Sequence, residues 1–239
     1  MFEPVKAGFR QFVAAFYAQV QPTTPALAEF AARGLFDSVA MASGRMVDQA
    51  EEMLAAYLRD EHHTATAPAR LPVILLAMAV DVIPTGRDYL RQLAAPEWVT
   101  IPGDPKERAF KMRTASNDLR AQVVIAAQNE PTARSLAAQF LLYLDAAPNR
   151  YFNSVHRFAG VDTDWPVEIE TADVPFVRVQ TDAKNLHLLA GDLTLKATVP
   201  LFMAPAAGEP NDGKGVPGTS DPAGYPLVSD VVTNFVEQA

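Results

Sequence analysis

The sequence predicts an α+β protein: a helical N-terminal part, a mostly antiparallel sheet with one packed helix, and an extended C-terminal arm. Residues 5–20 carry apolar side chains at helical spacing, and residues 191–202 alternate apolar and polar side chains as a half-buried strand does. Residues 204–226 hold 5 of the 19 prolines and 5 of the 12 glycines. We therefore divide the chain into regions 1–63, 64–203 and 204–239.

The N-terminal region is expected to be helical. An apolar face runs through the first helix from Val5 to Val20, and the pair Thr24–Pro25 is a typical helix start. Gly34 is expected to bend or end this second helix. The helical pattern then continues from Leu35 to Arg59, with a core that includes three methionines, Met41, Met46 and Met53.

The middle of the chain is harder to assign. The segment DEHHTATAPAR is expected to be an exposed loop, and the apolar run 71–80 fits a helix or a strand equally well by its period. Residues 97–114 predict short strands around a PGDP turn, after a PTGRD turn at 84–88.

A buried strand is predicted at 121–127, and Asn129 is expected to cap the helix that follows it. The segment DAAPNR ends this helix, and VDTDW (161–165) is interpreted as a turn. Two further strands are predicted at 167–170 and 174–180, the second forming a hairpin with the strand at 191–202. Gly191 is expected to mark a bulge or a bend.

Composition restricts the function. The net charge is −8 and the pI is about 5.0, which argues against a nucleic-acid partner. There are no cysteines, so disulfides and thiolate chemistry are excluded. The longest apolar run has only ten residues and the N-terminus does not resemble a secretion signal, so we expect no membrane partner and assembly in the cytoplasm.

Short motifs give little sign of catalysis. GEPNDGKG (208–215) matches a phosphate-binding loop except that Gly215 replaces the Ser or Thr that binds magnesium, and no helix can follow it. No third metal-ligating residue lies at the spacing from His62 and His63 that is typical of a metal site. Asp162 and Asp164 do not continue into a calcium loop. We expect no cofactor and no metal.

The C-terminal third suggests assembly with other chains. A long strand followed by an arm with little to bury is expected to leave an exposed sheet edge that pairs with a neighbour. The residues expected to face a partner or close the sheet are Leu193, Leu195, Val199, Leu201 and Tyr225, and those expected to meet an acidic ring are Arg108, Lys111 and Arg113. For Tyr225, the sequence favours packing within the molecule and contact with a partner equally.

Four segments together resemble structural proteins of contractile-tailed bacteriophages: LPVILLAMAVDVIPTGRDYLRQ, WVTIPGDPKERAFKMR, SLAAQFLLYLD and NLHLLAGDLTLKATVPLF. The likeness covers roughly residues 65–205. It implies a homo-oligomeric, non-enzymatic component of the virion tail that contacts tube, sheath or baseplate proteins. Both a neck or tail-terminator position and a ripcord-like adaptor in the baseplate are compatible with it.

Two other classes of function stay open. One is a cytosolic scaffold or chaperone that aids assembly and leaves the particle. The other is a soluble enzyme acting through carboxylates such as Glu168 and Glu170, which share one side of a predicted strand.

Overall fold

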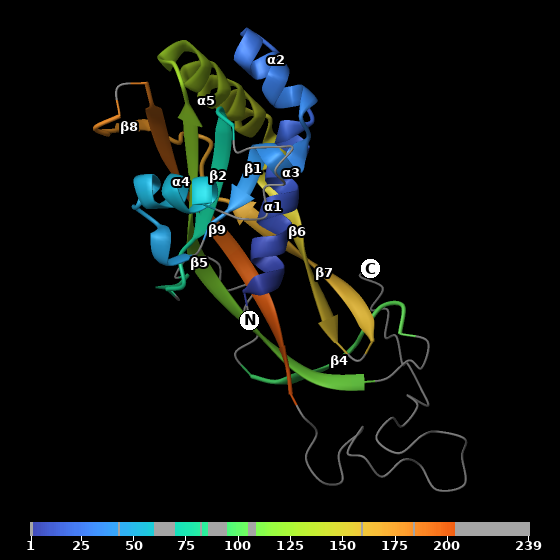
Figure 1. Cartoon of the computed structure of the whole chain (residues 1–239). Coiled ribbons are helices and arrows are strands. Elements are labelled where there is room, and N and C mark those ends of the chain that lie inside the picture. Colours follow the sequence, from blue (N-terminus) through green and yellow to red (C-terminus); the bar gives the residue numbers. More distant parts are fainter. Residues whose placement is uncertain are drawn as a thin grey trace, which may run out of the picture.

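The computed structural model describes residues 2–42, 44–59, 70–81, 83–85, 95–104, 109–158, 160–183 and 185–203. It has the predicted α+β architecture, with helices packed on a mixed, mostly antiparallel and strongly curled sheet (Figure 1). His62, His63, Arg108, Tyr225, the GEPNDGKG motif and the arm at 204–239 lie outside the described residues.

The first two predicted helices are confirmed. Helix α1 spans Glu3–Tyr17, and α2 spans Pro25–Ala32 with Thr24 as its N-cap, whose hydroxyl accepts the amide proton of Leu27. Gly34 follows the end of α2 as expected. The short helix α3, Leu35–Ser38, comes next.

The predicted continuous helix from Leu35 to Arg59 is wrong. After α3 the chain forms strand β1 (Val39–Met41), a 3₁₀ turn η1 (Gly44–Met46) and only then α4 (Ala50–Arg59). Strand β1 pairs in parallel with β2 (Val73–Met78). Local helical spacing is overridden here because β1 completes a sheet edge, and a segment this short takes its structure from tertiary pairing.

Two long antiparallel strands form the centre of the sheet. β5 spans Ala109–Ala127 and β9 spans His187–Phe202, and they pair continuously from Met112–Phe202 to Ala127–His187. The 19 residues of β5 extend over roughly 60 Å at the usual rise per residue. They run past the helices to what we call the distal end of the sheet, at the bottom of Figure 1.

Shorter strands flank this pair. Along the side of β5 that faces away from β9 lie β4 (Glu97–Thr100), β3 (Ile83–Pro84) and β2. Along the other side of β9 lie β8 (Val177–Val179) and β7 (Val161–Ile169), and β7 pairs with β6 (Tyr151–Phe158). The predicted hairpin between 174–180 and β9 is therefore confirmed.

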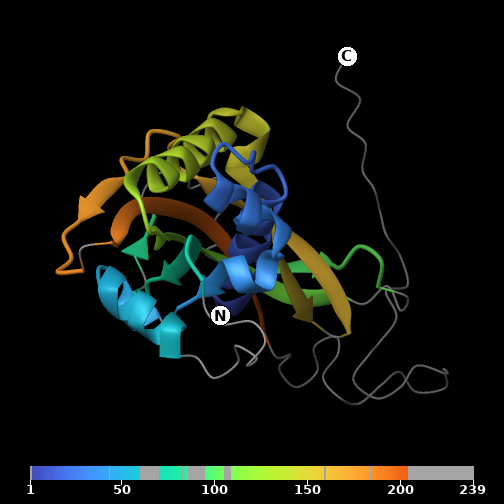
Figure 2. The same cartoon turned by 45° about the horizontal axis from the view of Figure 1, so that its top comes forward.

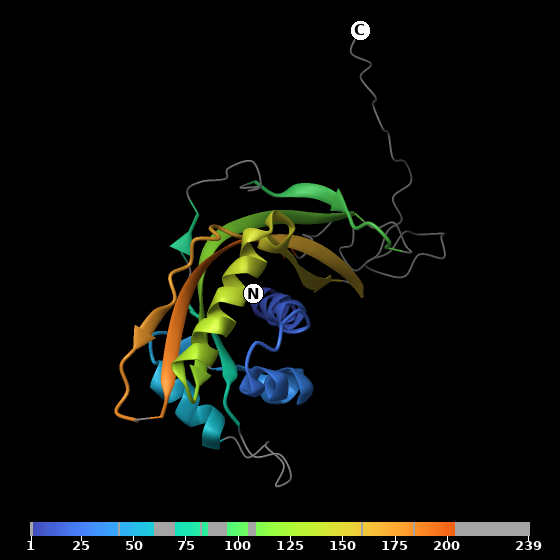
Figure 3. The ribbon, with the colours of Figure 1, turned by 90° about the horizontal axis from the view of Figure 1, so that it is seen from above.

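Each face of the sheet has its own core. Helices α1, α2 and α5 (Glu130–Asp145) cover one face with a large cluster that includes Phe9, Phe16 and Phe140. Figure 3 shows the sheet bending around these helices, and Figure 2 shows α5 lying across its upper part. Helix α4 covers the opposite face at β2 with a second cluster that includes Met53 and Tyr57.

This double coverage resolves the ambiguous run 71–80. All six residues of β2 are buried because α4 lies on one side and α1 with α2 on the other. A strand buried on both faces shows a continuous apolar run and no alternation.

Helix α5 agrees with its prediction. Asn129 caps it, since its side-chain oxygen accepts the amide proton of Thr132 at 2.9 Å. After α5, a 3₁₀ turn η3 (Ala147–Arg150) leads into β6.

The prediction for VDTDW is wrong, and of the two alternatives for Gly191, a bulge or a bend, the bulge is excluded. VDTDW is the first part of strand β7 and not a turn, which lies one step earlier at Gly160. Gly191 marks no bulge, because the β5–β9 register is unbroken through its pair with Val123. A Cβ at residue 191 would lie 3.0–3.1 Å from the Phe176 ring, so glycine admits that close contact.

Candidate functional site

The predicted exposed edge at 191–202 is wrong, because β9 lies inside the sheet. It pairs with β5 on one side and with β8 and β7 on the other. Leu193, Leu195 and Val199 are at most 1% exposed and belong to the core beneath the helices. The alternation therefore reflects a strand with one face buried inside its own molecule. Of the two roles expected for these residues, partner contact or closing the sheet, their burial fits the second.

The remaining described candidates gather on one patch at the distal end. Lys111 and Arg113 are two residues apart on β5 and point to the same face of the sheet. Arg113 lies opposite Leu201 of β9, and Lys111 lies opposite Trp98 of β4. We call these four residues, Trp98, Lys111, Arg113 and Leu201, the basic–aromatic patch.

This patch is accessible. The Trp98 side chain is 45% exposed, Arg113 is exposed, and Lys111 and Leu201 are partly exposed. The Lys111 ammonium lies 5.2 Å from the centroid of the Trp98 ring, a cation–π distance that holds the two side chains together. Tryptophan and arginine are among the residue types enriched at protein interfaces.

A groove lies on the other face of the distal end, between β4 and the first half of β7. Its volume is about 360 Å³. Met112 and Phe202 contribute apolar surface, and Asp162 and Asp164 line the β7 side. The remaining lining residues are Val99, Thr100, Ile101, Pro102, Thr163 and Trp165.

Three phenylalanines fix the tip of the β6–β7 hairpin near this groove. The Phe158 ring stacks on Phe202 with centroids 4.1 Å apart and meets Phe110 edge-on at 4.9 Å. These contacts join the hairpin tip to the ends of β5 and β9, and Phe202 is the member of this aromatic cluster that lines the groove.

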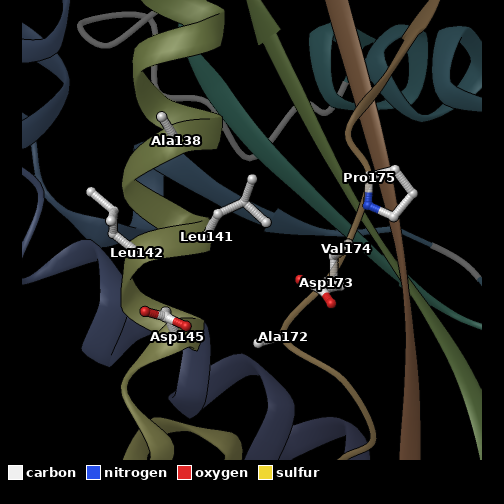
Figure 4. Close-up of a pocket in the computed structure, with 8 residues that line it drawn as sticks. All are labelled: Ala138, Leu141, Leu142, Asp145, Ala172, Asp173, Val174 and Pro175. Atoms are coloured by element: carbon white, nitrogen blue, oxygen red, sulfur yellow. The ribbon is translucent and has the colours of Figure 1, made fainter.

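A second open groove, of about 670 Å³, lies between α5 and residues 172–175 (Figure 4). Leu141 points from α5 toward Val174 and Pro175, and Asp145 and Asp173 are its two carboxylates. No described base, nucleophile or cation accompanies them in its lining, so it offers no arrangement typical of catalysis.

A charged network crosses the sheet at Arg120. Its guanidinium donates to both carboxylate oxygens of Asp48, at 2.7 and 2.6 Å, and to Asp192 at 2.9 Å. The hydrogen bond from Arg120 lowers the pKa of Asp48, and hydrogen bonds to Asp48 and then Asp192 raise the pKa of Arg120. Asp48 has a φ of 69°, in the left-handed region, so the turn before α4 is strained. The ion pairs with Arg120 hold this turn against the sheet.

A buried serine and a buried histidine meet on β6. Ser154 Oγ lies 3.2 Å from His156 Nε2, and Ser154 also donates to the carbonyl oxygen of Trp165. Both side chains are buried, and burial lowers the pKa of His156. They satisfy each other inside the sheet and do not line any groove described above.

Glu168 and Glu170, the two carboxylates of the enzyme hypothesis, lie near Lys196. Lys196 Nζ lies 4.0 Å from Glu170, and Lys196 is also the cross-strand neighbour of Glu168. This arrangement is the ordinary pairing of opposite charges across a ladder.

In the described part of the chain, no cluster of three or more His, Cys, Asp or Glu side chains is placed to hold a metal ion. No helix there is long and apolar enough to span a bilayer. Comparison with models of known protein families gave no match to this chain, and comparison with curated protein sequences gave none.

Proposed function

We propose that this chain is a non-enzymatic structural protein of a contractile-tailed bacteriophage that joins tail tube or sheath to the neck or the baseplate. The sequence resemblance over residues 65–205 suggests this class. Copies of the chain itself and acidic surfaces of neighbouring tail proteins are the proposed partners. Its proposed location is the virion tail, after assembly in the host cytoplasm.

The observation that carries the proposal is the basic–aromatic patch at the end of the long strand pair. Cations on a rigid sheet, beside an exposed tryptophan, suit a contact with an acidic neighbour because little side-chain or backbone freedom is lost on binding. The arm that follows β9 starts at the same end, because the Met203 amide donates to the carbonyl oxygen of Lys111 at 2.9 Å.

The proposal is tested on purified particles. Mass spectrometry of phage particles is expected to detect the chain as a stoichiometric component, and electron microscopy of the purified protein is expected to show closed rings. Absence from the particle with presence in the infected cell would favour an assembly scaffold. A monomer that turns over a substrate would favour the enzyme.

Charge reversal of the patch gives a sharper test. The double variant Lys111→Glu/Arg113→Glu is expected to fold normally, because both positions are at the surface, yet to weaken assembly about tenfold, as expected for reversing two interfacial charges. Sedimentation velocity of the protein and its incorporation into particles measure this loss.

The matched control is Arg10→Glu/Arg134→Glu, which makes the same charge change on exposed faces of α1 and α5. It is expected to assemble like the unmodified chain. Equal losses in both double variants would mean that net charge alone matters and would contradict a role for the patch.

A further inference from the structure

Strands β7 and β9 separate at two prolines. The Glu170 amide donates to the carbonyl oxygen of Thr194 at 2.9 Å, and the ladder continues to the pair Val167–Ala197. The next pair in this register is Trp165 with Val199. Its two flanking hydrogen bonds would need the amides of residues 166 and 200 as donors.

Both of these residues are prolines, so neither donor exists. The β7–β9 ladder therefore stops at Val167, and the first half of β7 departs from β9 with only β6 as its partner. On this free side the backbone groups of Asp162 and Asp164 have no strand opposite them among the described residues. Proline at such a position is typical of a strand edge.

The groove of about 360 Å³ lies along this open edge. It has β7 on one side, β4 on the other, and Met112 and Phe202 as apolar surface between them. Among the described strands β4 pairs only with β5, so its other side has no described strand beside it. An apolar floor beside a free strand edge suits an extended peptide, which adds main-chain hydrogen bonds to the edge and apolar side chains to the floor.

We infer that this groove binds residues 227–236, LVSDVVTNFV, of a second copy of the chain as an added strand beside β7. This inference rests on the proposed function and names where the arm of one subunit attaches to the next. The segment is rich in β-branched and aromatic residues, as strands are. It has one acid, Asp230, whereas Glu209, Asp212 and Asp221 precede it.

The length of the chain permits this reach. Phe202, beside which the arm begins, lines the groove, and 23 residues separate Met203 from Leu227. Fully extended, they span at most about 80 Å. That exceeds the roughly 60 Å length of β5, so the segment can reach the same groove on a neighbouring subunit.

Cysteine cross-linking of full-length chains tests the inference, because the natural chain has no cysteine. One chain carries Asp164→Cys in the groove and a second carries Val232→Cys in the arm. After mixing and mild oxidation, a disulfide-linked dimer of the two is expected on a non-reducing gel. The control partner is Val177→Cys, an exposed strand position on β8, far along β9 from the groove.

A second variant closes the groove. Pro166→Val/Pro200→Val supplies both missing amides, so the Trp165–Val199 pair is expected to form and the cross-link to fall to the control level. Hydrogen exchange checks the closure through slower exchange of the new amides. An unchanged cross-link in this closed variant would overturn the inference.

Two other outcomes would also overturn it. One is cross-linking of Asp164→Cys with Val232→Cys no stronger than that of the control pair. The other is a chain carrying both cysteines that links only within itself. If the protein still forms rings or enters particles in these cases, the proposed function stands without this attachment. If it does neither, the proposed function fails independently.

Discussion

Replacing Leu195 by alanine is expected to lower the free energy of unfolding by about 2–5 kcal/mol, the usual cost of deleting a buried leucine side chain. Leu195 is fully buried on β9, between Leu119 of β5 and Ile169 of β7 on the same face of the sheet. The helices close over these three residues, so the cavity left by the substitution cannot fill with solvent or collapse freely. Denaturant unfolding followed by circular dichroism measures the loss.

The matched control is Leu142→Ala. Leu142 is 72% exposed on α5, so the same chemical change there is expected to cost less than about 0.5 kcal/mol. If Leu195→Ala unfolds like the unmodified chain yet fails to assemble, Leu195 faces a partner and the described core is wrong. The Lys111→Glu/Arg113→Glu variant is expected to show the opposite pattern, normal stability with weakened assembly.

Sequence reasoning found the helices whose caps and periodicity are local. Thr24 and Asn129 each satisfy an amide three residues ahead, a signal that lies wholly within a short segment. The segment from Leu35 onward has no such cap at Val39, and its structure depends on pairing with Ile74 and Leu75. Long-range pairing of this kind leaves no local trace.

The alternation at 191–202 predicts a strand, which the structure confirms, whereas the predicted edge is wrong. An alternating pattern predicts which side chains face the core and which face solvent. It does not indicate how many strands pair with the backbone of that segment. The two neighbouring strands, β5 and β7, are distant in the sequence. The partner of Leu195 on β5 is Leu119, and its partner on β7 is Ile169. The central position of β9 in the sheet therefore could not be predicted from its own segment.

The groove has a signal in the sequence, which is a pair of prolines. Pro166 and Pro200 each interrupt an otherwise strand-like run, and proline in a strand indicates a side without a partner. Their joint effect appears only once the register shows that the two hydrogen bonds of the missing Trp165–Val199 pair would both need a donor at a proline. The basic–aromatic patch needs the same knowledge, since Trp98 meets Lys111 only through the β4–β5 register.

Replacing Gly8 by leucine is expected to destabilise the chain by about 2–3 kcal/mol, as overpacking of a filled site does. Glycine inside a helix normally costs about 1 kcal/mol relative to alanine, so its presence in α1 requires a compensating contact. A Cβ at residue 8 would lie 2.5 Å from the carbonyl oxygen of Asn153 and 3.0 Å from the Phe152 ring. Because the nearest atom belongs to the backbone of β6, the helix itself must move away.

That movement has a second consequence, because β6 is the outermost of the described strands on this side of the sheet and α1 lies against it. A strand edge that loses its cover can pair with other chains. Light scattering of Gly8→Leu is therefore expected to show aggregation at temperatures where Ala7→Leu, the same side chain one residue away on the exposed face of α1, stays dispersed. Equal stability and equal scattering of the two variants would mean that α1 does not contact β6 so closely, and the protected edge would have to be sought elsewhere in the sheet.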